Sequence, residues 1–144
     1  MSPLYRLVTL VSLSSIGAMA ARFTVLLCAA QSGASPFMVG LLATAFAAAA
    51  AACAVPVGRT TDRAGTKRPL LFGTAILVVA LALGAAWRDL PLLFVIAILG
   101  GLAHSTLIIA FQRLAGDLAP PNGRAEAFGL LAFGFSIAIL AAPV

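Results

Sequence analysis

Charged side chains are scarce in this chain of 144 residues. Lys, Arg, Asp and Glu make up 9% of it, whereas an average soluble domain carries about 25%. Hydrophobic residues make up 62%, so too few polar groups remain to cover the surface of a soluble domain of this size. The composition therefore argues against a water-soluble monomer and favours a protein that is surrounded largely by lipid.

Acidic residues and cysteines are rarer still, with 4 Asp and Glu and 2 Cys in the whole chain. Cys28 and Cys53 both lie within apolar runs, which is typical of small hydrophobic residues and not of a disulfide or a metal site. In a membrane protein, a net charge of +5 is explained first by the orientation of the chain, so it does not imply a polyanionic partner. We expect no enzyme activity, no catalytic residue, no metal, no cofactor and no nucleic-acid partner.

Five apolar runs are long enough to span a bilayer as helices, which takes roughly 20 residues each. They cover residues 7–30, 37–57, 70–87, 90–111 and 127–144. The predicted fold class is all-α and integral to the membrane, with 1–144 forming one transmembrane bundle. The first run also resembles a signal peptide with small residues at Ala18 and Ala20, but the apolar residues that follow favour a retained helix.

The connections between these runs alternate in charge, and this alternation predicts the orientation of the chain. A cytoplasmic N-terminus places seven basic residues on the cytoplasmic side and leaves only Arg88 outside, which is the distribution that the positive-inside rule requires. The seven are Arg6, Arg59, Arg63, Lys67, Arg68, Arg113 and Arg124.

The connection after the second run, GRTTDRAGTKRPL over residues 58–70, carries the most specific signal. Its two glycines permit tight turns, and Asp62 is able to sit near a helix N-terminus or to accept a hydrogen bond from Arg63. Its basic residues favour the anionic inner leaflet. The string resembles the signature loop between helices two and three of the major facilitator superfamily, with these residues in register: Gly58, Asp62, Arg63, Gly65, Lys67 and Leu70.

This resemblance implies an incomplete N-terminal six-helix bundle, from a fold of about twelve helices in two bundles that transports solutes by alternating access. In that family the loop contacts the opposite half and helps to hold the outward-open state. The resemblance thus implies a conformational latch built from Gly58, Asp62, Arg63, Gly65, Lys67 and Arg68. Two departures from the family pattern weaken an assignment as a drug and proton antiporter. Many such antiporters carry an intramembrane Arg ahead of the glycine pair, but here Ile96 and Ala97 precede Gly100. The Gly-Pro signature of helix five is only hinted at by Ala142 and Pro143.

Two ionisable side chains are predicted at membrane depth, where a charge costs at least about 2.5–3.5 kcal/mol. Arg22 suits a carboxylate or phosphate ligand, although an Arg there also snorkels to water or braces its helix. His104 either titrates and biases a conformational cycle, or only hydrogen-bonds beside Ser105 and Thr106. Their depths differ by about 10 Å, so we expect no contact between them. All four carboxylates are expected in loops.

The second run also has small residues at a spacing of four, at Gly40, Thr44 and Ala48. This spacing predicts a helix face that packs closely against a neighbouring helix.

The sequence thus predicts a membrane transporter of a small solute, working by alternating access, with efflux as one candidate direction. Its expected partners are the lipid bilayer, an unidentified small-molecule substrate and a second, C-terminal half. Its expected location is the plasma (inner) membrane. A small non-transporting membrane protein with an interaction or assembly role stays open as the alternative.

Overall fold

The computed structural model describes residues 3–86, 89–120 and 123–141, with side chains from Leu7 onward. This part of the chain holds five α-helices and no strand: α1 (Pro3–Gln31), α2 (Pro36–Ala64), α3 (Lys67–Ala86), α4 (Leu90–Leu118) and α5 (Arg124–Ala141). Four of these described helices, α1 to α4, are long and apolar enough to cross a membrane. The predicted all-α membrane fold is confirmed.

The helices extend beyond the apolar runs that revealed them. The second run was predicted to end at Val57 and the fourth at Phe111, but α2 continues to Ala64 and α4 to Leu118. A hydrophobic run measures the lipid-facing length, whereas a helix continues into the polar interface because its backbone groups still need hydrogen bonds. Residue 87, at the end of the third predicted run, and residues 142–144, at the end of the fifth, lie outside the described residues.

The helix ends follow ordinary local chemistry. At the start of α2, Ser35 has an extended backbone and its side chain accepts a hydrogen bond from the Met38 amide, while Pro36 occupies the first helical position. Gly33 has a φ of 79° and ends the short connection after α1. These local signals produce an antiparallel α1–α2 pair.

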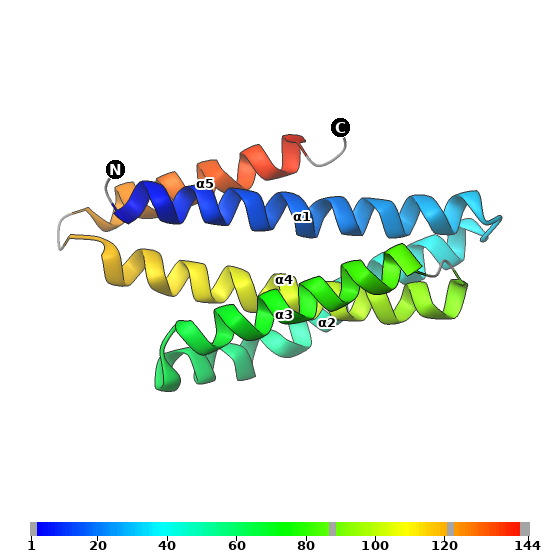
Figure 1. Cartoon of the computed structure of the whole chain (residues 1–144), viewed down its shortest axis with the longest axis horizontal. Helices are drawn as coiled ribbons and strands as arrows, with labels where there is room; N and C mark the ends of the chain where they lie inside the picture. Colours follow the sequence, from blue (N-terminus) through cyan, green and yellow to red (C-terminus); the bar gives the residue numbers. More distant parts are fainter. Residues whose placement is uncertain (1–2, 87–88, 121–122, 142–144) are drawn as a thin grey trace.

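Helix α4 lies at the centre of the bundle (Figure 1) and contacts all four other described helices. It packs most extensively against α2 and α3, while α1 packs mainly against α5 and α4. Glycines allow two of these close approaches: Gly73 of α3 lies against Leu107 of α4, and Gly134 of α5 lies against Ser12 of α1.

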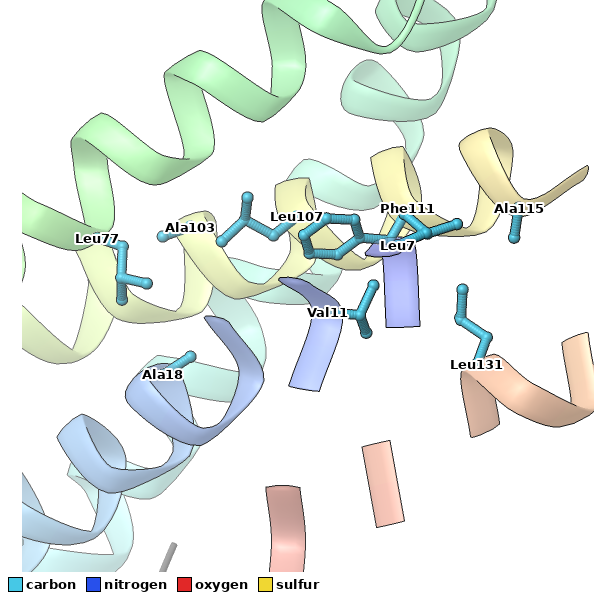
Figure 2. Close-up of a cluster of buried hydrophobic side chains, with 9 residues drawn as sticks. All are labelled: Leu7, Val11, Ala18, Leu77, Ala103, Leu107, Phe111, Ala115 and Leu131. Atoms are coloured by element: carbon cyan, nitrogen blue, oxygen red, sulfur yellow. The ribbon is translucent and has the colours of Figure 1, made fainter. Parts of the chain in front are cut away.

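Two apolar clusters form the interior. The cluster in Figure 2 joins α1, α3, α4 and α5 through Leu7, Val11, Ala18, Leu77, Ala103, Leu107, Phe111, Ala115 and Leu131. The second cluster joins α1, α2, α3 and α4 through Val25, Ala29, Leu42, Phe46, Ala80, Leu93, Ile96 and Ala97. Along α1 the two clusters are separated by the turn that carries Arg22.

The small-residue face of α2 is exposed in the described part of the chain, so its predicted packing role stays a prediction. Gly40, Thr44 and Ala48 are all exposed, and an added Cβ at Gly40 would have no neighbour within 4 Å. Helix α2 instead buries Leu42, Phe46 and Thr61. The large side chains at Leu42 and Phe46 bury more apolar area than the small face does, so they decide which face of α2 points inward.

Candidate functional site

Most of the segment that carries the family signature is helical and not a loop. Helix α2 runs through Asp62 to Ala64, and α3 begins at Lys67. The expectation that all four carboxylates lie in loops is therefore wrong. Asp62 and Asp117 lie in the last turns of α2 and α4, Glu126 lies in the first turn of α5, and Asp89 is the N-cap of α4.

Asp62 is paired across helices and not with its sequence neighbour. Nη1 of Arg113 in α4 donates a hydrogen bond of 3.2 Å to Oδ1 of Asp62. Nε of the same Arg113 lies 3.3 Å from Oδ1 of Asp117. The predicted bond from Arg63 is thus replaced by an Asp62–Arg113–Asp117 chain that joins the ends of α2 and α4. The side chains of Asp62 and Arg113 are 67% and 50% exposed, so the pair contributes at most about 1 kcal/mol to stability.

The two glycines of the signature have different roles. Gly65 has a φ of 76° and terminates α2, a conformation that a residue with a Cβ adopts only with strain. Gly58 lies inside α2, and an added Cβ there would have no neighbour within 4 Å. The predicted tight turn is confirmed at Gly65 and is wrong at Gly58.

The basic residues of the signature are exposed at this same end of the bundle. Arg63 lies in the last turn of α2, where a cation is favourable to the helix dipole. Lys67 and Arg68 lie in the first turn of α3, where a cation is unfavourable. The positions of Lys67 and Arg68 therefore reflect a requirement other than helix stability.

Arg22 lies on the inward face of α1. Ala18 and Val25, one turn before and after it on the same face, are both buried. Its guanidinium carbon Cζ lies 5.0 Å from the centre of the Phe46 ring of α2, which is a cation–π contact. Leu42 and Gly100 line the same small space, whose volume of about 10 Å³ admits one water molecule. This placement disfavours a side chain that reaches outward to the lipid headgroups.

The position of Phe46 is set by a pair of glycines in α4. The Phe46 ring lies 3.2 Å from where a Cβ of Gly100 would be, and a Cβ on Gly101 would overlap the carbonyl oxygen of Phe46. Only residues without a side chain allow α2 and α4 to approach this closely. The glycine pair therefore holds the aromatic ring under Arg22.

His104 contacts the same ring. Its imidazole centre is 5.9 Å from the Phe46 ring centre, with the two planes at 44°. Ser14 and Ser15 of α1 line the space beside it. Among the described residues His104 has no hydrogen-bond partner, and the neighbouring Thr106 hydroxyl donates to the Leu102 carbonyl of its own helix at 2.7 Å.

Sequence reasoning selected Arg22 and His104 but missed Phe46, the residue that both of them contact. A phenylalanine in an apolar helix has no distinguishing pattern. The signal for this contact is the Gly100–Gly101 pair, because adjacent glycines in a transmembrane helix indicate the close approach of a neighbouring helix.

Comparison with known families agrees with the signature. The family model described as Major Facilitator Superfamily matches residues 7–144, which include α2 to α5 and all of α1 except its first turn.

Proposed function

Because this chain belongs to the major facilitator superfamily, a family of membrane transporters, we propose that it binds and moves a small solute by alternating access. The family match over residues 7–144 is the observation that carries this proposal. The polar groups Arg22 and His104 support it, because both contact Phe46 of α2 within apolar spanning helices, where ionisable side chains mark substrate pathways.

We propose the signature segment as the conformational latch. The Asp62–Arg113 pair ties the end of α2 to the end of α4, so a movement of one helix end is transmitted to the other. Since both side chains are about half exposed or more, the pair can exchange partners at little cost when the bundle rocks. The remaining latch residues are Gly58, Arg63, Gly65, Lys67 and Arg68.

We also propose that this end of the bundle faces the cytoplasm of a plasma or inner membrane. The N-terminal end of α1, the α2–α3 connection and the α4–α5 connection lie at the same end of the molecule in Figure 1. Six basic residues with described side chains lie on these segments: Arg59, Arg63, Lys67, Arg68, Arg113 and Arg124. This concentration is what the positive-inside rule associates with the cytoplasm.

The transport path is proposed to be completed by a second helical bundle. Many large apolar side chains on the outside of the described helices, such as Phe37, Val55 and Phe133, are more than 60% exposed. These faces suit lipid or further helices. The substrate would then bind between Arg22 and His104 on one side and the second bundle on the other.

The test compares small solutes inside and outside cells that lack, contain or overproduce the full natural protein. A cell line with the Asp62→Asn variant at equal expression is the control. A transporter changes the distribution of at least one solute, and the direction of the change gives the direction of transport. Identical solute profiles in all four lines would refute the proposal and favour a non-transporting membrane protein.

A further inference from the structure

The positive charge at Arg22 has no counter-charge within the described bundle. All four carboxylates of the chain lie at helix ends, and two of them are engaged with Arg113. Among the described residues, the guanidinium of Arg22 has the Phe46 ring as its contact and no hydrogen-bond or ion-pair partner. A cation at this depth requires acceptors for its donors.

The donors of Arg22 are open to an incoming group. No buried side-chain nitrogen or oxygen in the described part of the chain lacks a hydrogen-bond partner. Because the Arg22 nitrogens have no such partner, they are not sealed inside the bundle. The side chain is half-buried. Its guanidinium lies over the Phe46 ring, and the N–H donors point outward in the plane of the guanidinium, where an acceptor binds.

We propose that Arg22 and His104 form a proton-linked binding site for a small oxyanion, a carboxylate or a phosphate. The proposal rests on the transport function above and adds its substrate class. The guanidinium fork matches the two oxygens of such an anion. Phe46, held by Gly100 and Gly101, contacts the fork from α2 and also contacts the imidazole of His104.

The proton link follows from the charges that surround His104. From α1 the uncharged Ser14 and Ser15 line the space beside it, and from α2 it faces Phe46, the ring that Arg22 also contacts. The described parts of α3 and α5 place no charged group beside it. A proton on His104 would add a second positive charge next to Arg22, which is unfavourable until an anion arrives. An anion therefore binds together with a proton and binds more tightly at low pH.

The experiment measures thermal unfolding of the purified full natural protein in detergent, with sodium benzoate, inorganic phosphate or benzamide added. Benzamide is the uncharged analogue of benzoate. Each is measured at about pH 6 and about pH 8, on either side of the usual range of histidine. We expect benzoate or phosphate to raise the unfolding temperature, and its apparent affinity to be at least about 5-fold higher at pH 6.

Four variants identify the groups responsible. Arg22→Gln abolishes the anion effect, and Arg22→Lys weakens it because a point charge lacks the fork. His104→Gln still binds the anion at pH 8 but loses the higher affinity at pH 6. Because phosphate itself titrates between these pH values, any pH dependence that remains in His104→Gln measures the contribution of phosphate. Arg59→Gln, which removes an exposed charge from α2, is the matched control and keeps the full effect.

The outcomes separate this proposal from the transport function. It is overturned if neither anion stabilises the protein more than benzamide does, or if Arg22→Gln, or Arg22→Lys where the Gln variant does not fold, retains the whole effect. Equal affinity at both pH values in wild type overturns the proton link. A solute difference in the cell profiles combined with any of these results leaves the transporter in place and removes only the proposed substrate class.

Discussion

The contact between Gly101 of α4 and Phe46 of α2 gives the sharpest structural prediction. In Gly101→Ala the new Cβ would overlap the Phe46 carbonyl oxygen and lie 3.0 Å from its carbonyl carbon and 3.3 Å from the Ala49 Cβ. Ordinary carbon contacts lie at about 3.5–4.0 Å, so the two helix backbones must separate by at least about 0.5 Å. The obstacle is backbone and not a flexible side chain, so it cannot rotate away.

The magnitude follows from two opposing effects. Forcing an extra carbon into a packed interface costs about 1–3 kcal/mol, while Gly to Ala within a helix gains about 0.5–1 kcal/mol. We therefore expect a net loss of about 1–2 kcal/mol and a fall in unfolding temperature of about 2 °C or more. Gly129→Ala is the control, because its Cβ would have no neighbour within 4 Å and only the helix gain applies.

The assay uses the two free cysteines of the protein. Cys28 and Cys53 are half-buried, so a thiol-reactive fluorescent dye reports their exposure as the full natural protein unfolds on heating in detergent. The reasoning is refuted if Gly101→Ala unfolds at or above the wild-type temperature. It is also refuted if Gly129→Ala is destabilised as strongly as Gly101→Ala, because then any added methyl group is harmful.

The remaining predictions concern the signature segment. In intact cells, a cysteine at Thr66 should resist an impermeant thiol reagent added outside while one at Ser35 should react; the reverse pattern would contradict a cytoplasmic signature segment. Asp62→Asn should change the unfolding temperature little, because its ion pair with Arg113 is exposed and worth at most about 1 kcal/mol, yet it should reduce solute movement in cells; unchanged movement would remove the latch role. Gly65→Ala should cost about 1–3 kcal/mol, because its φ of 76° and ψ of 176° lie in a region open essentially only to glycine, and a thermal unfolding midpoint equal to that of the wild type would argue against this helix end.

The positions of the spanning helices were predictable because their signal is local. A run of about 20 apolar residues has few alternatives to a membrane helix, and the basic residues at one end of the molecule were visible as short clusters. The helix ends were less predictable. Asp62 and Asp117 look like loop residues by composition, but each continues a helix begun in the membrane, where propagation adds one hydrogen bond per residue.

The contacts that matter for function were not predictable, because they join residues far apart in the chain. The partner of Asp62 is Arg113, 51 positions away, and a neighbouring arginine at position 63 was the obvious candidate from sequence alone. The inward face of α2 was not predictable for a related reason. Small residues at a spacing of four show which face can approach closely, but the burial of Leu42 and Phe46 determined which face turned inward.

The orientation of Arg22 is a case in which sequence periodicity held more information than the hydrophobic run alone. The buried residues Val11, Ala18, Val25 and Ala29 of α1 recur at spacings of seven and four, and position 22 falls on the same face. The nearest buried residues of this face, Ala18 and Val25, give an arginine no side-chain acceptor, so its presence there implies that acceptors come from elsewhere. The structure supplies only the Phe46 ring among the described residues. A ring stabilises the cation but accepts none of its five N–H donors, and this unmet requirement is the physical basis for assigning an oxyanion to the site.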